Sequence, residues 1–319
     1  MSKNKIKGKK SNRIFKIFLA VLITITLLLG GTAVWGVNKF RTLVDNSYTQ
    51  LPDGENTDQN KQQKPSKELE SFHILLLGVD SRDGDRGRSD TIIVATVNPH
   101  TEQILLTSLP RDTYAKIPGY GSTKINHAMA HGGVSLVKDT VEQFLDIEID
   151  HYMTIDFKGF QKAIDVLGGV TINVEKDMRY RDPTDGTNIS IKKGLQELDG
   201  KNSLDYVRFR TDSEADYGRM RRQQEFIRAV VEEMTQFSNV TRVIPFIEAV
   251  SGGIETDVHR TQVEALVKRF FGVRGSAIQS ESIESRSYQD NDGIWFVEIT
   301  ASERDRVSRV LEEFKAKKE

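Results

Sequence analysis

Three apolar segments between residues 72 and 109 constrain the fold more than any other part of the chain. Segment 72–79, FHILLLGV, is an almost continuous apolar run, and segments 91–97 and 104–109 repeat this pattern. Runs of this length are typical of strands that are covered on both faces of a sheet. We therefore expect three strands in the interior of an α/β domain.

Charged residues stand at the ends of these three segments. Open α/β sheets bind ligands in the crevice outside their strand ends, so such charges are expected to share one site. Carboxylates among several guanidinium groups suit a metal ion together with an oligophosphate. The alternative interpretation is a set of strand-end ion pairs that face water. The residues concerned are Asp80, Arg82, Arg88, Asp90, Arg111 and Asp112.

Helical and strand patterns alternate after this region. Apolar residues recur at a helical period over 134–145, a strand pattern at 152–157 precedes a helical one at 158–166, and another strand pattern follows at 170–174. Such alternation favours an α/β fold with a mixed central sheet and helices on both faces. We expect this domain to span residues 72–319.

The following polar stretch and the last third of the chain carry no chemical motif. Residues 177–193 predict a surface loop or hairpin, and the apolar stripe at 226–234 predicts core packing, as do segments 243–250 and 263–271. Late strands are expected at 282–288 and 294–299, with a turn at 290–293 between them. Ser302 is expected to cap the final amphipathic helix.

A second group of charges begins at residue 205. Arg208 and Arg210 point to one side if their backbone is extended, while Arg219, Arg222 and Gln223 share one face of a helix. Guanidinium groups bind phosphate with paired hydrogen bonds and stay charged when they are desolvated. The alternative interpretation is a self-neutralised surface network, because five acids accompany the arginines. These acids are Asp205, Asp212, Glu214, Asp216 and Glu225.

The beginning of the chain predicts a membrane anchor. Residues 1–16 carry seven Lys or Arg, and residues 17–37 carry no charge. A helix over 17–37 spans roughly 30 Å, the thickness of the hydrocarbon core of a bilayer. The basic tail is expected to stay in the cytoplasm, which makes residues 38–71 an extracellular linker and 72–319 an extracellular domain. A cleaved signal peptide is the alternative.

Composition excludes several functional classes. Residues 1–41 hold nine basic residues and no acid, which leaves 36 basic against 46 acidic residues in the remainder, a net charge of −10. A domain of this charge is a poor partner for nucleic acid. The absence of cysteine excludes disulfides, thiolate metal sites and cysteine nucleophiles. Neither a Gly-x-Ser-x-Gly elbow nor a Walker phosphate loop occurs.

Five short motifs resemble those of the LytR-CpsA-Psr family and occur in order over residues 72–235. They are Gly78-Val79-Asp80-Ser81-Arg82, Arg88-Ser89-Asp90-Thr91, Ser108-Leu109-Pro110-Arg111-Asp112, Lys124-Ile125-Asn126-His127-Ala128, and Asp216-Tyr217-Gly218-Arg219 with Arg222-Gln223. The resemblance implies a transferase of phosphorus-containing groups in cell-wall biogenesis. Such an enzyme moves an anionic glycopolymer, for example wall teichoic acid, from a polyprenyl pyrophosphate carrier to peptidoglycan.

The chemistry of the residues agrees with this implied activity. We expect Asp80 and Asp90 to hold Mg²⁺ or Mn²⁺, and Arg111 to stabilise charge in the transition state, so that these three residues are catalytic. The acceptor proton would pass to Asp80, Asp90 or Asp112. The residues expected to bind the pyrophosphate are Arg82, Arg88, Arg111, Arg208, Arg210, Arg219 and Gln223.

Two other functions remain open at this point. The domain is also suited to hydrolysing polyprenyl pyrophosphate, since water can replace the acceptor hydroxyl. A membrane-bound transcriptional attenuator of cell-wall genes is the second alternative, but an outward-facing acidic domain has no basic face for DNA. The expected partners are therefore the lipid-linked polymer, peptidoglycan and the membrane, without nucleic acid.

Overall fold

The three predicted apolar segments are adjacent strands in the computed structural model of the protein. β1 (Phe72–Val79) pairs antiparallel with β2 (Ser89–Asn98), which pairs antiparallel with β3 (Gln103–Leu109). Most of their side chains are buried on both faces, as a covered strand requires. The structure describes residues 41–42, 45–51, 69–79, 89–182, 187–210, 215–236, 253–270 and 272–318.

These strands form the centre of a mixed six-stranded sheet, in the order β11-β6-β1-β2-β3-β12. β6 (His151–Asp156) runs parallel to β1, and β12 (Ile278–Glu281), which follows the short helix η1 (Gly275–Ala277), runs parallel to β3. β11 (Ile254–Thr256) is antiparallel to β6. The predicted mixed sheet is confirmed.

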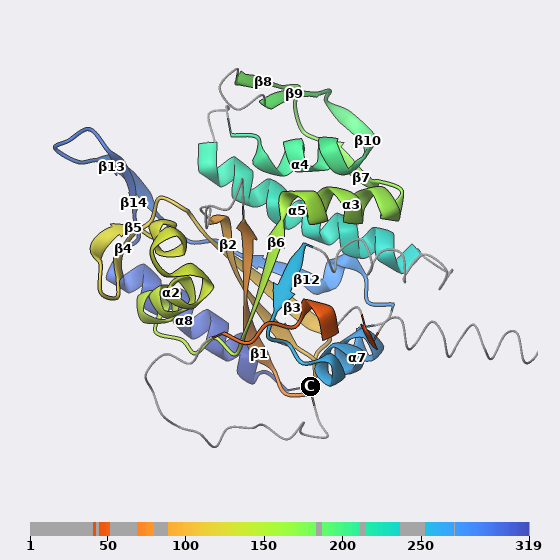
Figure 1. Ribbon diagram of the computed structural model, residues 1–319, viewed down its shortest axis with the longest axis horizontal. Coiled ribbons are helices and arrows are strands. Elements are labelled where there is room, and N and C mark those ends of the chain that lie inside the picture. Colours follow the sequence, from red (N-terminus) through yellow and green to blue (C-terminus); the bar gives the residue numbers. More distant parts are fainter. Residues whose placement is uncertain are drawn as a thin grey trace, which may run out of the picture. The chain divides into compact units, whose positions relative to one another are not determined.

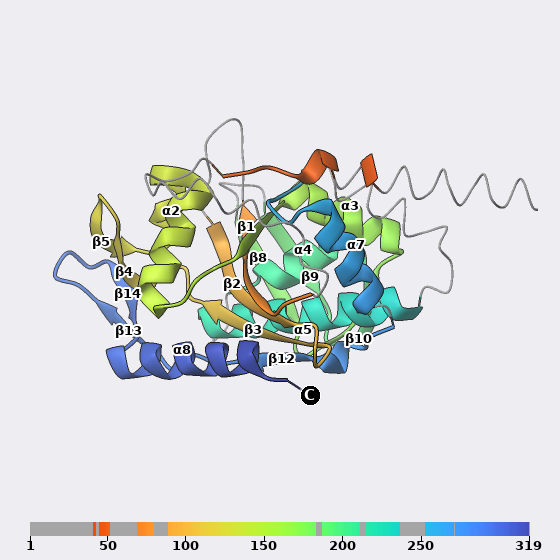
Figure 2. The same ribbon diagram turned by 90° about the horizontal axis from the view of Figure 1, so that it is seen from below.

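Helices cover both faces of this sheet, as predicted. On one face, α2 (His127–Leu145) and α8 (Ala301–Ala316) pack with alternate residues of β1, β2 and β3. On the other face, α5 (Ala215–Gln236) and α7 (Arg260–Arg269) pack with the intervening residues. Figure 2 looks at the strands from below, with α2 to the left of β1 and β2 and α7 to the right.

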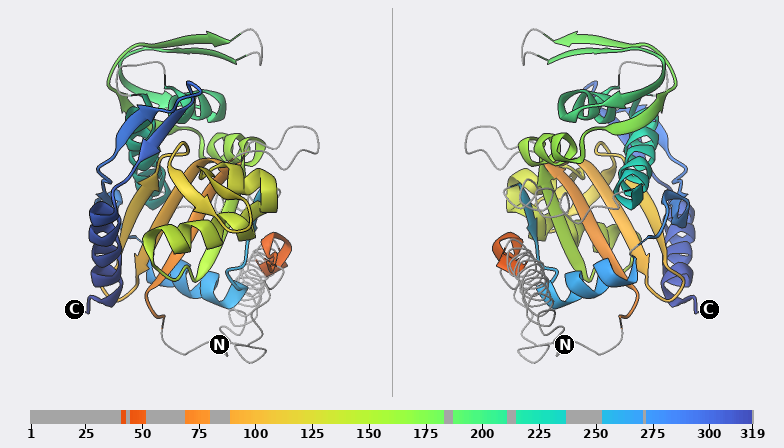
Figure 3. Two further views of the ribbon diagram at one scale, coloured as in Figure 1. Left: turned by 90° about the vertical axis from the view of Figure 1, so that its left-hand side faces the viewer. Right: turned by 90° about the vertical axis from the view of Figure 1, so that its right-hand side faces the viewer.

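A third layer lies beyond one end of the sheet and contains α3 (Phe157–Leu167), α4 (Gly200–Arg208) and part of α5 (Figure 1). It also contains the pair β7 (Val170–Val174) and β10 (Gly194–Leu198), and the hairpin β8 (Met178–Asp182) with β9 (Thr187–Ile191). This layer has its own apolar core. Figure 3 shows the β8–β9 hairpin at its outer margin, so of the surface loop or hairpin expected at 177–193 the hairpin is present.

Two further hairpins flank the sheet on the side of α2. They are β4 (Tyr114–Ile117) with β5 (Gly121–Lys124), and β13 (Arg286–Gln289) with β14 (Trp295–Glu298). The late strands and the turn at 290–293 are therefore present as predicted, and Figure 1 shows the β13–β14 hairpin extending outward beside β4 and β5.

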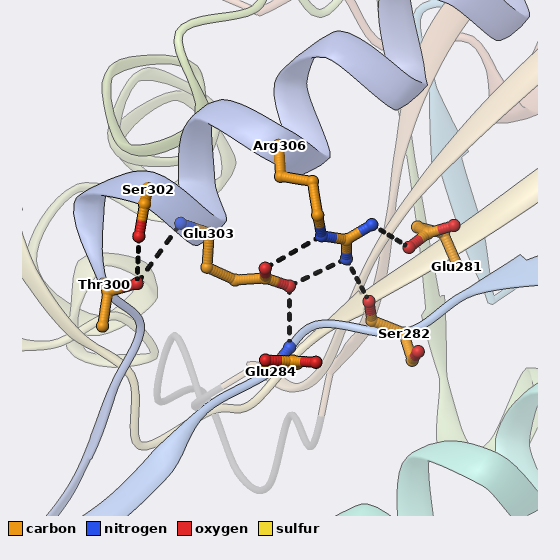
Figure 4. Close-up of polar contacts among 7 residues, drawn as sticks. All are labelled: Glu281, Ser282, Glu284, Thr300, Ser302, Glu303 and Arg306. Carbon is orange, nitrogen blue, oxygen red and sulfur yellow. Dashed lines mark hydrogen bonds and ion pairs between the residues drawn. The ribbon is translucent and has the colours of Figure 1, made fainter.

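The start of α8 is held by a polar network that joins it to β12 (Figure 4). The hydroxyl of Thr300 accepts from the Glu303 N–H at 3.2 Å and caps the helix, while Ser302 already lies in the first turn. The expected cap at Ser302 is thus wrong, because the helix begins one residue before it. Glu303 accepts from Arg306, whose Nη1 also donates to Glu281 at 2.8 Å.

Residues 45–51, inside the predicted linker, lie against the sheet. The Thr49 N–H donates to the carbonyl of Thr256 at 2.8 Å, and the Tyr152 hydroxyl donates to the carbonyl of Thr49 at 2.6 Å. The predicted tail and anchor, residues 1–37, and the helical segment 243–250 lie outside the described residues. No helix within the described part of the chain is long and apolar enough to cross a membrane.

Candidate active site

The candidate site lies where one edge of the sheet meets the layer of α3, α4 and α5. Because β1, β2 and β3 alternate in direction, the end of β1, the start of β2 and the end of β3 share this edge. Asp90 on β2 thereby reaches Arg111, which follows β3. The Arg111 Nη1 donates to the Asp90 Oδ1 at 2.7 Å.

A cavity of about 480 Å³ opens at this edge. Its size falls in the range of sites for small molecules and cofactors. Its apolar wall is supplied by the central strands and by α3, α4 and α5, with Ile93, Phe160, Phe226 and Val230 as examples. Its polar lining includes Asp90, Arg111, Arg208, Arg210, Arg219 and Gln223. The cavity therefore combines a cationic group of side chains with a large apolar surface.

Arg111 is held in its charged form by carboxylates. Burial acts to lower the pKa of Arg111, but Asp90, Asp112 and Asp216 outweigh it and raise this pKa above the ordinary value. The Nε of Arg111 is buried and has no hydrogen-bond partner among the described residues. Arg111 thus keeps an N–H donor beyond its ion pair with Asp90.

Arg219 is a nearly buried cation on the first turns of α5. Its side chain is 5% exposed, and its Nη2 lies 3.1 Å from the Oδ1 of Asp216. Burial lowers its pKa, Asp216 acts in the opposite sense, and the neighbouring Arg111 and Arg210 lower it further. Its Nε also lacks a partner among the described residues. An anion placed among these mutually repelling arginines would be bound strongly.

Gln223 connects α5 to the sheet. Its amide Nε2 donates to the Thr91 hydroxyl at 2.9 Å and to the Val207 carbonyl at 3.3 Å. Thr91 pairs with Gly78 in the ladder, and a Cβ at Gly78 would lie 3.0 Å from the Cβ of Thr91. A side chain at position 78 would therefore crowd Thr91. Both amide donations of Gln223 go to protein acceptors in this arrangement.

The other arginines of the second group take different positions. Arg208 is the last residue of α4, so it does not share an extended strand with Arg210, and its guanidinium lies 4.7 Å from the centre of the Phe157 ring. Arg222 is fully buried and bonds Glu175 at 3.1 Å and the carbonyl of Phe209. The predicted helix is present, but only Arg219 and Gln223 of its three polar residues line the cavity.

Three predicted site residues, Asp80, Arg82 and Arg88, lie outside the described residues. Within the described part of the chain, no group of three or more acids or histidines is placed to hold a metal ion. The Asp90 side chain is 31% exposed and lines the cavity. Since Mg²⁺ is commonly held by one or two carboxylates together with substrate phosphates, Asp90 fits such a site.

The family resemblance implies an apolar slot for the prenyl chain between the sheet and the helices, but the sequence does not identify the residues that line it. The sequence pattern assigns the stripe on α5 to core packing, whereas Phe226, Ile227, Val230 and Val231 line the cavity. An apolar stripe at helical spacing is the same signal in both cases. Only the position of α5 over the sheet edge reveals this second role.

Comparison with known proteins identifies the relatives of this chain. The model of the LytR_cpsA_psr family matches residues 37–313. The polyisoprenyl-teichoic acid--peptidoglycan teichoic acid transferase TagU of Oceanobacillus iheyensis is 34% identical, over 97% of each chain. The crystal structure of Bacillus subtilis TagV has a TM-score of 0.68 at 32% identity, over 77% of this chain and 97% of TagV. A structure of TagT bound to LI-WTA has a TM-score of 0.65 at 26% identity, over 84% of this chain and 98% of TagT.

Proposed function

The chain belongs to the LytR_cpsA_psr family, and from this premise we propose that it transfers an anionic glycopolymer of the teichoic acid type from a polyprenyl pyrophosphate carrier to peptidoglycan. One observation carries the proposal: a single cavity joins an arginine cluster to a large apolar wall. A lipid pyrophosphate has the same two parts. The teichoic acid transferases among the relatives support the substrate class.

In this proposal the pyrophosphate lies among Arg111, Arg208, Arg210 and Arg219. Arg111 and Arg219 line the cavity and supply guanidinium N–H donors to it. Guanidinium groups bind phosphate oxygens through charge-assisted hydrogen bonds, which are stronger than neutral ones. The prenyl chain extends along the apolar wall, where its burial is favoured by about 25 cal/mol per Å².

The reaction is a substitution at phosphorus. The acceptor hydroxyl oxygen forms a bond to the phosphorus that carries the polymer, and the bond from this phosphorus to the bridging oxygen breaks. Polyprenyl phosphate leaves with the bridging oxygen and its electron pair. The hydroxyl proton passes to a carboxylate, for which Asp90 and Asp112 are the described candidates and Asp80 a third. Arg111 stabilises the charge that develops on the phosphoryl oxygens.

We further propose that Asp90, with Asp80, holds Mg²⁺ or Mn²⁺. A divalent cation at the pyrophosphate supplies charge neutralisation for the leaving phosphate. The same proposal includes the membrane: residues 17–37 anchor the chain, residues 1–16 stay in the cytoplasm, and the domain lies outside the cell, next to the lipid that it uses.

The test is transfer by the purified full chain in detergent, with lipid-linked polymer as donor and uncross-linked peptidoglycan as acceptor. We expect covalently linked polymer together with released polyprenyl phosphate. Product formed only when peptidoglycan is present supports the transferase. Equal release of polyprenyl phosphate without peptidoglycan, and no linked polymer, would instead identify a pyrophosphatase.

A further inference from the structure

A second cavity, of about 280 Å³, has a lining of opposite chemistry to the first. Its walls come from the turn after β3, the first turns of α5 and the β13–β14 hairpin. The residues that matter here are Pro110, Asp112, Asp216, Tyr217, Met220 and Trp295. The first cavity has arginines in its polar lining, whereas the second has two carboxylates and an aromatic surface. No Lys or Arg belongs to the described lining of the second cavity.

This second cavity adjoins the first through two pairs of residues. Asp112 lines the second cavity and follows Arg111 of the first directly in the chain. Asp216 lines the second cavity and forms the 3.1 Å ion pair with Arg219 of the first. A molecule in the second cavity therefore lies next to the arginine cluster.

The aromatic surface of Trp295 and Tyr217 is exposed, and hydrogen bonds fix the segments that carry it. The side chains of Trp295 and Tyr217 are 57% and 42% exposed, which leaves ring surface available to a ligand. The Val297 N–H donates to the carbonyl of Asp112 at 2.9 Å, and the Tyr217 hydroxyl donates to the carbonyl of Ser285 at 2.8 Å. Hydrogen bonds thus connect the β13–β14 hairpin and the residue before it both to the turn that carries Arg111 and to α5.

This lining indicates which ligand class the cavity accepts. A sugar ring has C–H groups on its faces, which stack on aromatic rings, and hydroxyl groups at its edge, which donate to carboxylates. Asp112 and Asp216 each form an ion pair through Oδ1 and keep about a fifth of the side chain exposed. Their partners, Lys124 and Arg219, are engaged in these ion pairs, so the described lining offers a polyphosphate chain no unpaired Lys or Arg. The lining therefore fits an uncharged saccharide better than the anionic donor polymer.

We propose that this second cavity binds the glycan strand of the acceptor, an uncharged chain of N-acetylated hexosamines, and presents its hydroxyl to the phosphate held by Arg111 and Arg219. The inference rests on the proposed function, since it names the site for that reaction's second substrate. Trp295 and Tyr217 stack on sugar rings, and the carboxylates of Asp112 and Asp216 accept from their hydroxyls.

Binding can be followed through Trp295 itself. The chain has two tryptophans, Trp35 and Trp295, so the full-length Trp35→Phe variant in detergent reports on Trp295 alone. Titration with a β-1,4-linked tetramer of N-acetylglucosamine should shift and saturate its fluorescence, and adding Tyr217→Ala should weaken binding by about fivefold to tenfold. Inorganic pyrophosphate should leave the signal unchanged. Trp295 fluorescence that does not change when the tetramer is added would overturn the inference.

Kinetics with both substrates separate this inference from the proposed function. Trp295→Ala should raise the KM for uncross-linked peptidoglycan about tenfold and leave the KM for the lipid-linked donor unchanged. Ile294→Ala is the matched control, because Ile294 is an exposed apolar neighbour outside the cavity lining. If Trp295→Ala transfers polymer with an unchanged KM for peptidoglycan, the proposed acceptor site in the second cavity is wrong, but the proposed function still holds. A wild-type protein that binds the tetramer but transfers no polymer would refute the proposed function instead.

Discussion

Replacement of Arg111 by alanine is the most informative change at the candidate active site. In the proposed reaction its guanidinium faces the charge that develops on the transferred phosphoryl group. At about 4 Å and an effective dielectric constant of about 20, one such charge pair is worth about 4 kcal/mol. A loss of this size in the transition state lowers the rate about 10³-fold.

The same change should have a small effect on folding. The ion pair between Arg111 and Asp90 is partly exposed, and pairs of this kind contribute at most about 1 kcal/mol. For a domain of this size that amounts to a fall in Tm of about 2–4 °C. The variant should therefore remain folded while its transfer rate falls.

The assay compares kcat for polymer transfer with thermal unfolding of the same preparations. Arg179→Ala is the control, because Arg179 is an exposed arginine of β8 that does not line the cavity, and it should retain wild-type transfer. Transfer by Arg111→Ala within a factor of about three of wild type, in a folded protein, would show that Arg111 does not stabilise the transition state.

Three more predictions concern the cavity, the metal and pH. Val230→Trp should obstruct the apolar wall of the cavity and weaken binding of a polyprenyl phosphate. Met234→Trp, one turn further along α5 and outside the lining, should bind normally; equal binding by both variants would argue against lipid binding in this cavity. EDTA should stop transfer and added Mg²⁺ should restore it, so undiminished turnover in metal-free buffer would exclude the proposed cation. Burial, assisted by Lys315, lowers the pKa of His73 against the opposing effect of Glu312 and Asp150. The unfolded chain then binds the proton at higher pH than the folded protein, so the free energy of unfolding falls as pH drops through the ordinary histidine value of about 6.5. His73→Gln should flatten the dependence of Tm on pH in this range. An unaltered pH dependence of Tm would show that His73 does not cause the loss of stability at low pH.

The proximity of Asp90 and Arg111 was predictable because its signal is local. Apolar strands with charged ends identify Asp90 and Arg111 from the chain alone, and their 2.7 Å contact follows from three strands of alternating direction. The extended backbone considered for Arg208 is absent, since α4 continues through this residue. The hydrophobic pattern of a short polar segment is too weak to predict the residue at which such a helix ends.

The residues of the apolar wall and of the second cavity were not predictable for a different reason. The stripe that includes Phe226 and Val230 has the spacing of any buried helix face, and only its place over the sheet edge exposes it to a cavity. Trp295 stands in a predicted late strand without a chemical motif. Its proximity to Asp112 results from the hydrogen bond of Val297 across the fold, a contact between distant parts of the sequence.

The most direct test of the account is a crystal structure of the protein with a polyprenyl pyrophosphate. We expect phosphate oxygens within hydrogen-bond distance of Arg111 and Arg219, and a prenyl chain in contact with Phe226 and Val230. A lipid bound elsewhere on the domain, with the 480 Å³ cavity empty, would contradict it.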